Sequence, residues 1–266
     1  MIYFFLFLIG DLLSSLPFDL LFSLVQLPVP ALYIIIRTST SLVFTVFLFH
    51  VYTFKVLHLQ PQDFNITLQI KPWGIWIAIL LPGSVLTVFA LIGQLEIPTH
   101  SFAQTVWILL SSATIALKSG ITEEILFRGY IMKLLENRWN KRIAVLLPSI
   151  LFSLAHIPSM KDFSLIGAVL LIISGTLVGI LFSLLTYCGD SIANIILVHV
   201  SWNFLLITDV LHITTAQQAY GDPLLSIQLP SDHVLLTGSD FGIEASLVAI
   251  AGYLLVCIFL LHRSQK

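Results

Sequence analysis

The sequence predicts an all-α, polytopic membrane protein, a helical bundle with about eight transmembrane helices. Hydrophobic residues make up 58% of the 266 positions, charged residues only 10%, and the mean hydropathy is +1.00. Soluble domains carry about 25% charged residues, so this composition excludes an ordinary soluble protein. The formal net charge of −2 gives no electrostatic basis for binding nucleic acid. We therefore expect the lipid bilayer to be the environment of this chain.

Breaks between apolar runs divide the chain into candidate spans close to the roughly 20 residues that a bilayer requires. They cover residues 2–25, 30–54, 73–94, 102–135, 142–157, 164–187, 191–212 and 242–262. We expect one integral membrane domain over residues 1–266, with a retained first helix because a basic segment typical of signal peptides is missing. The 34-residue fourth run would extend about 51 Å as a helix. It must tilt, project into water or break, and Ser119-Gly120 is the plausible break.

Charge in the connections predicts the orientation in the membrane. Basic residues gather in three segments: Lys55 and Lys71; Arg138, Lys141 and Arg142; Arg263 and Lys266. The longest loop, 213–241, has no Lys or Arg and contains Asp222, Asp232 and Asp240. Eight spans place the basic segments on one side, so the positive-inside rule predicts two cytosolic termini, with Lys161 and Arg37 as exceptions. The compact chain favours a bacterial plasma membrane over the endoplasmic reticulum.

Small residues recur every four positions in the sixth span, at Gly175, Gly179 and Ser183. Such a stripe permits close approach of helices, either between two copies of the chain or within one chain. We favour packing within one chain, and the sequence leaves the oligomeric state open.

Glu123, Glu124 and Arg128 form a cluster of charge inside the fourth span. Each charged side chain at bilayer depth costs roughly 2.5–3.5 kcal/mol, so such clusters occur where they pair or have a function. Glu124 and Arg128 are four residues apart and share a helix face, as an ion pair requires. Glu123 points about 100° away and is predicted to face a cavity. The alternative is that both acids belong to a packing network.

Two further polar groups have the same four-residue spacing. Phe152 and His156 end the fifth span, where a lone histidine is commonly structural. His199 and Asn203 lie in the middle of the seventh span, where an unpaired polar group is costly. They form either a pair of hydrogen-bond donors, as in an oxyanion hole or a water-orienting site, or a buried polar pair that joins two helices.

Several intramembrane chemistries are excluded by spacing. The sequence contains no H-E-x-x-H motif of zinc peptidases. Cys188-Gly189-Asp190 lacks the first glycine of the G-x-G-D motif of aspartyl intramembrane proteases, and Leu117-Lys118-Ser119-Gly120 lacks the first glycine of a rhomboid-type G-x-S-G. The widely separated Cys188 and Cys257 indicate neither a disulfide framework nor a thiolate metal site.

The three polar groups together resemble a known family. E-E-x-x-x-R at Glu123–Arg128, F-x-x-x-H at Phe152–His156 and H-x-x-x-N at His199–Asn203 stand in the order found in the CPBP family. That family includes type II CAAX prenyl endopeptidases, bacteriocin-processing enzymes and their bacterial relatives, such as lysostaphin-resistance proteins. The resemblance covers about residues 120–205, and we place the catalytic core at about 102–212.

The resemblance implies a helical bundle that encloses a polar cavity open to the cytosolic side, and hydrolysis of a peptide bond in a membrane-associated protein or peptide. By position, Glu123 would activate water and His156 would help to hold it. His199 and Asn203 would stabilise the oxyanion, while Glu124 and Arg128 would brace the site. Both a glutamate-only mechanism and a divalent metal such as zinc fit the family; Glu123, His156 and His199 would then be the three protein ligands.

A membrane transporter, or an ion or proton relay that uses the same buried charges, is the alternative function. One geometric difficulty accompanies the peptidase hypothesis. The predicted spans place His156 near the external end of its helix and Glu123 near the middle of the fourth span. The two meet only if the fifth span reaches a shallow depth or the predicted boundaries are shifted.

Overall fold

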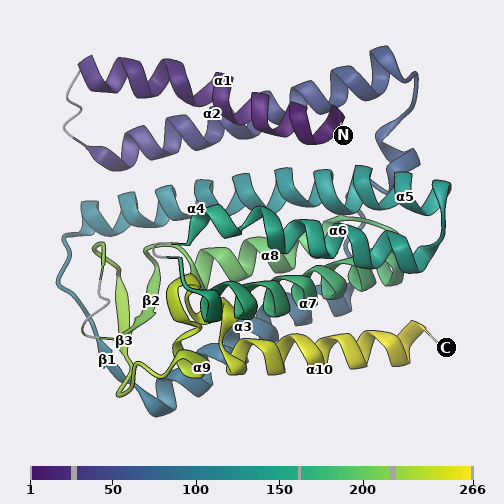
Figure 1. Cartoon of the computed structure of the whole chain (residues 1–266). Coiled ribbons are helices and arrows are strands. Elements are labelled where there is room, and N and C mark those ends of the chain that lie inside the picture. Colours follow the sequence, from purple (N-terminus) through teal and green to yellow (C-terminus); the bar gives the residue numbers. More distant parts are fainter. Residues whose placement is uncertain (1, 25–28, 161–162, 216–219, 265–266) are drawn as a thin grey trace.

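The computed structural model describes residues 2–24, 29–160, 163–215 and 220–264, and it is a helical membrane bundle (Figure 1). Its helices are α1 (Ile2–Leu24), α2 (Pro30–Val51), α3 (Pro72–Ile92), α4 (Phe102–Glu124), α5 (Met132–Arg138), α6 (Lys141–Ala155), α7 (Leu165–Gly189), α8 (Ala193–Leu206), α9 (Val234–Thr237) and α10 (Leu247–Ser264). Six helical stretches in the described residues are long and apolar enough to cross a membrane, and Ala193–Leu206 and Leu247–Arg263 are shorter apolar helices. The eight predicted runs are therefore confirmed as helices.

The fourth predicted run does not break at Ser119-Gly120, so that prediction is wrong. The helix is continuous through both residues, and the Ser119 hydroxyl donates to the Ile115 carbonyl oxygen of the preceding turn. A Cβ atom at Gly120 would lie 2.6 Å from Val200 Cγ2, so the missing side chain brings α4 against α8 instead of breaking the helix. The irregularity comes five residues later, where Ile125–Ile131 form a π-helical segment between α4 and α5.

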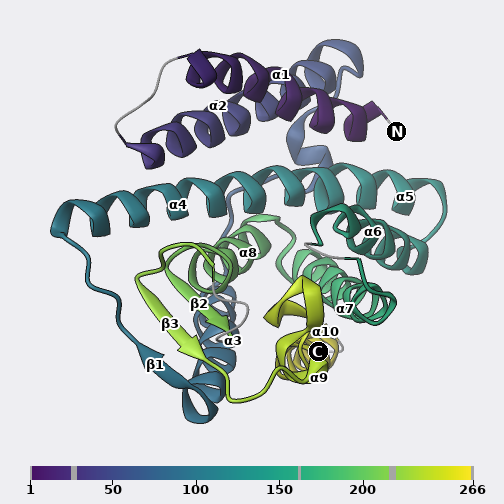
Figure 2. The same cartoon turned by 60° about the vertical axis from the view of Figure 1, so that its left-hand side comes forward.

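Helix α4 separates two layers of the bundle, as Figures 1 and 2 show. The α1–α2 hairpin lies on one side, and α3, α6, α7, α8 and α10 lie on the other. Lys118, which matched no motif, joins the layers through an ion pair from its Nζ to Asp11 Oδ1 at 2.8 Å. The rings of Tyr3 and Tyr130 stack at 3.7 Å and form a second link. The hairpin is thus docked onto the helix that carries the acidic motif.

The stripe of small residues in α7 serves packing within the chain. A Cβ atom at Gly175 would lie 2.7 Å from Ser153 Cβ, and one at Gly179 would lie 2.7 Å from Ser149 Cα. Only glycine leaves room for α6 at these two positions. The close contact holds α6 and α7 together beside the polar residues described below.

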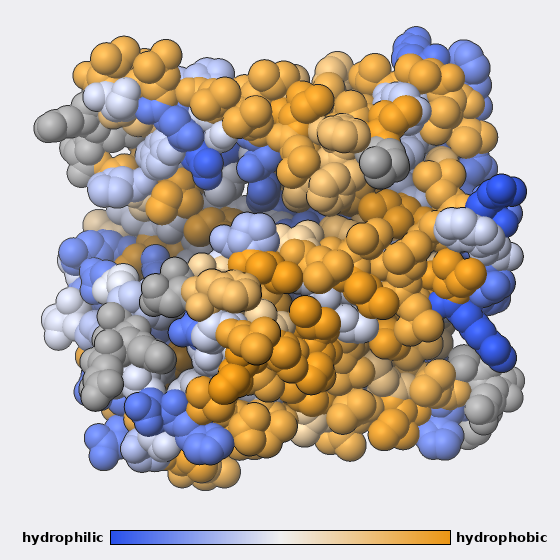
Figure 3. All heavy atoms as spheres, in the orientation of Figure 1, coloured by the Kyte–Doolittle hydropathy of each residue, from blue (hydrophilic) through white to orange (hydrophobic). Residues whose placement is uncertain are grey.

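The predicted 213–241 loop contributes to a small sheet that the sequence did not predict. Strands β2 (Leu211–Thr214) and β3 (Leu225–Gln228) are parallel, and β1 (Gln94–Glu96) pairs antiparallel with β3. The sheet lies at one end of the bundle, and α5 lies at the other. Hydrophobic side chains cover the face between these ends, and hydrophilic residues gather toward both (Figure 3). This distribution is what a membrane-embedded bundle requires.

Candidate active site

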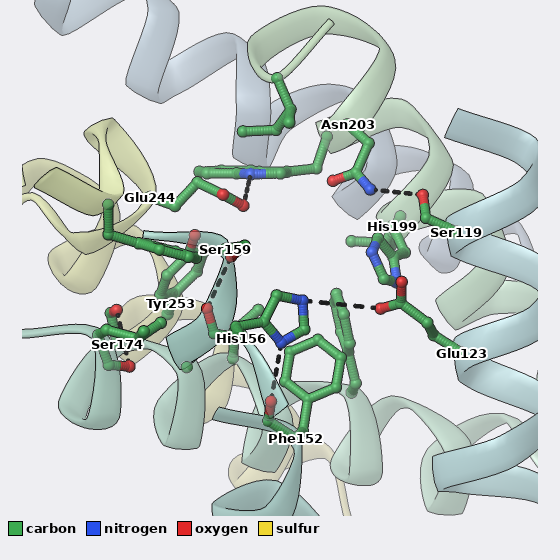
Figure 4. A pocket seen from close by; sticks show the side chains of 18 of the residues that line it. Ser119, Glu123, Phe152, His156, Ser159, Ser174, His199, Asn203, Glu244 and Tyr253 are labelled. Carbon is green, nitrogen blue, oxygen red and sulfur yellow. Dashed lines mark hydrogen bonds and ion pairs between the residues drawn. The ribbon is translucent and has the colours of Figure 1, made fainter. Parts of the chain in front are cut away.

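A cavity of about 380 Å³ brings the three polar groups together. Its walls come from α4, α6, α7 and α8, with contributions from α3, α10 and the loop that precedes α10. Glu123, His156, His199 and Asn203 all line it, and Figure 4 shows their side chains around one space. The structure thus assembles in one place residues that are up to 80 positions apart in the sequence.

Glu124 and Arg128 form a fully buried pair behind the cavity. Arg128 Nη1 lies 3.2 Å from Glu124 Oε2, and both side chains have 0% exposure. The guanidinium lies 4.6 Å from the centre of the Phe152 ring and 5.1 Å from that of Phe182, within the range of cation–π contacts. The predicted ion pair on one helix face is therefore present.

His199 joins this pair from α8. Its Nδ1 lies 2.7 Å from Glu124 Oε1, and because an ionised carboxylate only accepts hydrogen bonds, Nδ1 carries the hydrogen. The bond fixes the orientation of the ring, so Glu124 positions a histidine that lines the cavity. Glu124 thus links α4 to α8 as well as pairing with Arg128.

Glu123 points elsewhere, as the helical geometry predicts. Its side chain is 16% exposed and lines the cavity, and its Oε2 has no hydrogen-bond partner among the described residues. His156 Nε2 lies 3.9 Å from this oxygen. The other ring nitrogen, Nδ1, donates to the Phe152 carbonyl oxygen at 2.8 Å, so Nε2 is the atom presented toward Glu123. The F-x-x-x-H spacing places this carbonyl one turn before the histidine.

The predicted mismatch in depth between His156 and Glu123 disappears in the structure. Helix α6 has only 15 residues, about 22 Å of helix against a hydrocarbon core of about 30 Å. Its end lies level with Glu123 in the bundle, as the 3.9 Å between His156 Nε2 and Glu123 Oε2 shows. His156 follows directly as the C-cap residue and reaches the middle of the long fourth run.

Asn203 lies on the same wall of the cavity as His199. Its Nδ2 donates to the Ser119 hydroxyl at 2.8 Å, which uses one of its two N–H groups. Ser119 stands one turn before Glu123, so α4 contributes both a carboxylate and the hydroxyl that orients the asparagine. The remaining N–H of Asn203 is available for a group in the cavity.

Glu123, His156 and His199, which would be the ligands of a metal according to the family resemblance, do not form a metal site among the described residues. The described residues contain no group of three or more His, Cys, Asp or Glu side chains that could hold a metal ion. Instead, His199 Nδ1 is used by Glu124 and His156 Nδ1 by a backbone carbonyl. The three residues line one cavity without forming a metal-binding group.

Sequence reasoning missed Glu244, which lies in the short 3₁₀ segment Ile243–Ala245 before α10. Its Oε1 accepts a hydrogen bond from Trp202 Nε1 at 3.1 Å, and Figure 4 shows it across the cavity from Glu123. Burial raises the pKa of the Glu244 carboxyl above its ordinary value. Its one signal in the sequence is an acid just before an apolar run, which does not reveal that the loop folds back over the cavity.

Comparison with known proteins supports the pattern of motifs. Residues 104–205 match the family model described as "Type II CAAX prenyl endopeptidase Rce1-like". The matched segment contains all three polar groups and ends before Glu244. No curated protein and no solved structure gives a match.

Proposed function

The chain belongs to the CPBP family of membrane peptidases through residues 104–205, and from this premise we propose that it is an intramembrane endopeptidase with Glu123 as its water-activating base. The family as a whole indicates a peptidase with a membrane-associated peptide or protein substrate. One observation carries the assignment of the base: Glu123 is the carboxylate of the E-E-x-x-x-R motif that faces the cavity without a hydrogen-bond partner among the described residues. We further propose a single membrane domain, with its catalytic core at about 102–212.

The proposed reaction begins with the hydrolytic water. The 3.9 Å between Glu123 Oε2 and His156 Nε2 is too long for a direct hydrogen bond, and one water molecule fits such a separation. The Glu123 carboxylate removes a proton from this water, and the hydroxide oxygen bonds to the carbonyl carbon of the scissile peptide. His156, held by the Phe152 carbonyl, orients the water.

The tetrahedral intermediate then carries a negatively charged oxygen. The second N–H of Asn203 supplies one hydrogen bond to it, and the Nε2–H of His199 supplies another when the ring beside the Glu124 carboxylate is protonated on both nitrogens. Ser119 and Glu124 orient these two groups in advance. The proton held by Glu123 passes to the leaving nitrogen as the C–N bond breaks, which yields an amine and a carboxylate. Glu124 and Arg128 do not touch the substrate in this proposal; they position His199.

The test is Glu123→Gln, which keeps the size of the side chain and removes the base. We expect the new protein N-termini that appear in membranes of cells expressing the wild-type protein to fall to background with this variant. General-base contributions of about 10²–10⁴ in rate account for such a loss. Glu136→Gln is the matched control, because Glu136 lies further along the same helical run and pairs with Lys133 at 3.1 Å.

Undiminished cleavage by Glu123→Gln, with the control variant also active, would overturn the proposal. Ion or proton flux into proteoliposomes that depends on Glu124 would support the relay instead. Amounts of folded protein are compared by size-exclusion chromatography in detergent, so that a loss of activity is separated from a loss of protein.

A further inference from the structure

The cavity holds a second carboxylate that the proposed reaction does not use. Glu244 lies in the segment Ile243–Ala245, whose first and last side chains are buried. Its Oε1 accepts the hydrogen of Trp202 Nε1 at 3.1 Å, so the backbone and the carboxylate are both held in place. Figure 4 shows this carboxylate across the cavity from Glu123. Glu244 is therefore a positioned acid that faces the space in which the substrate would lie.

The charge of Glu244 has no positive partner among the described residues. No Lys, Arg or His nitrogen of these residues lies within ion-pair distance of its carboxylate. The described lining of the cavity contains two carboxylates, those of Glu123 and Glu244, and no Lys or Arg. Burial raises the pKa of the Glu244 carboxyl, and a bound cation would favour its ionised form again. An acid kept out of bulk water at this cost indicates a function.

Aromatic rings line the cavity together with this acid. The ring centres of Trp202 and Tyr253 lie 5.2 Å apart, and Phe241 comes from the loop three residues before Glu244. Figure 4 shows Tyr253 on the same side of the cavity as Glu244. Aromatic faces attract ammonium and guanidinium groups, and a carboxylate accepts charge-assisted hydrogen bonds from them. This part of the wall has the chemistry of a site for an organic cation.

Other occupants fit this wall less well. An anionic side chain would be repelled by Glu244 and Glu123 together, and an apolar one would cover a carboxylate without giving it a hydrogen bond. A purely structural role, in which Glu244 anchors its loop to α8 through Trp202, requires only an acceptor oxygen, which a glutamine also provides. The negative charge is the feature that these alternatives leave unexplained.

We propose that Glu244, Trp202 and Tyr253 form a specificity subsite that receives a lysine or arginine side chain of the substrate. Because the subsite faces Glu123 across one cavity of about 380 Å³, the basic residue lies close in sequence to the peptide bond that is cut. The inference deepens the proposed peptidase function and rests on it for the reaction, whereas binding of a cation does not require cleavage. Glu244 lies outside the matched segment 104–205, so the family match assigns it no role.

The preference at the cleavage site is the first test. New N-termini that depend on Glu123 are mapped in membranes of cells that express the wild type, Glu244→Gln or Asp232→Asn. In the wild type we expect Lys or Arg at one fixed position near the cut bond. For Glu244→Gln the ratio of basic to neutral residues there should fall by about 10-fold or more, as the loss of a hydrogen bond to a charged group implies. An equal loss at every site, or an unchanged ratio, would overturn the subsite.

Asp232→Asn is the matched control for this test. It removes the same charge from an exposed acid of the preceding loop, which is not among the described residues that line the cavity. We expect this variant to keep the basic preference of the wild type. Size-exclusion chromatography in detergent compares the amounts of folded protein.

Cation binding is measured separately, by thermal unfolding in detergent at pH 8. The probes are N-acetyl-lysine methylamide and N-acetyl-norleucine methylamide, which has a side chain of similar shape without the charge. A ligand that binds only the folded state raises the unfolding midpoint. We expect the lysine probe to raise the midpoints of the wild type and Asp232→Asn more than the norleucine probe does, and Glu244→Gln to respond equally to both. Equal shifts by both probes in the wild type would overturn the subsite.

The two measurements separate the subsite from the peptidase function. If the cut sites depend on Glu123 but carry no basic preference, the subsite is overturned and the peptidase function stands. If no site depends on Glu123, the peptidase function fails, and the unfolding midpoints alone decide whether the cavity binds a cation through Glu244.

Discussion

Glu123 and Glu124 are neighbours in sequence that have different partners in space. Glu124 is fully buried and meets both Arg128 and His199, so its charge is neutralised inside the bundle. Burying such a pair costs desolvation energy and is weak evidence for stability. Its structural consequence is the fixed orientation of His199. Glu123, one residue earlier, faces the cavity because a helix turns about 100° per residue.

Two acidic residues near the cavity are predicted to give opposite pH dependence. Burial raises the pKa of Glu244, so the folded state holds its proton more tightly and loses relative stability as pH rises above the ordinary carboxyl pKa. The Ser164 hydroxyl, which donates to Asp240, lowers the pKa of that carboxyl. Asp240 therefore stabilises the fold above the ordinary carboxyl pKa, and this contribution is lost as pH falls.

We therefore expect Glu244→Gln to raise the thermal unfolding midpoint relative to wild type at pH 8 and to have little effect near pH 4. Asp240→Asn should lower the midpoint at pH 8, with a deficit that shrinks on acidification. Thermal unfolding in detergent at both pH values measures the two variants side by side. If the midpoints of both variants, each measured relative to wild type, change in the same direction between pH 4 and pH 8, the environments of Glu244 and Asp240 do not shift the two carboxyl pKa values in opposite directions.

At the scale of elements, two local irregularities shape the site. The π-helical segment Ile125–Ile131 follows directly after the acidic pair, and Ile125–Tyr130 are all buried. A wider turn of this kind is often found at functional sites and here carries Arg128. The second irregularity is the short α6, whose early end places His156 opposite Glu123.

Close packing of α6 and α7 leads to a prediction at this scale. Gly179→Ala would place a Cβ atom 2.7 Å from the backbone at Ser149, so the helices must separate. We expect a loss of about 1–3 kcal/mol, the usual range for overpacking, seen as a lower unfolding midpoint in detergent. Gly83→Ala in α3 is the matched control, because its Cβ atom would meet nothing within 4 Å. Equal midpoints for the two variants would contradict this account of the stripe.

At the scale of the whole molecule, one ion pair links the α1–α2 hairpin to α4. Lys118 and Asp11 come from different layers, and Ser41 also donates to Asp11 at 2.7 Å. A charge left without its partner at bilayer depth is costly. The pair therefore links the hairpin to the same helix that carries Glu123.

A double-mutant cycle with Asp11→Asn and Lys118→Met measures this link. We expect each single variant to lower the unfolding midpoint and the double variant to lose less than the sum, with a coupling of about 0.5–3 kcal/mol. Asp19→Asn and Arg37→Met form the matched control cycle, because that pair lies within the hairpin and is about 40% exposed. Its coupling should be about 0–1 kcal/mol. Additive losses at Asp11 and Lys118 would show that the hairpin is held by other contacts.

The sequence by itself determined the class of fold and the three polar groups. Apolar runs predicted the eight longest of the α-helices that the structure describes, because a membrane span is a local property of about 20 consecutive residues. Four-residue spacing likewise predicted the Glu124–Arg128 pair, since both partners lie on one helix. In contrast, the sheet pairs β1 with β3, which is more than 100 residues away in the sequence, and adds β2 beside β3. No local pattern in the sequence predicts this pairing.

Only the tertiary structure decided which polar groups face one another around the cavity. The contacts of His156 with Glu123 and of His199 with Glu124 depend on helix depth and rotation, which interhelical packing sets. Gly120 is a further example, because its sequence context predicts a helix break. In the structure the helix continues, and Val200 of α8 packs against the position where a side chain would stand. Glu244 reaches the cavity because its loop folds back over the bundle end. Periodicity along one helix carries no information about such contacts between separate elements.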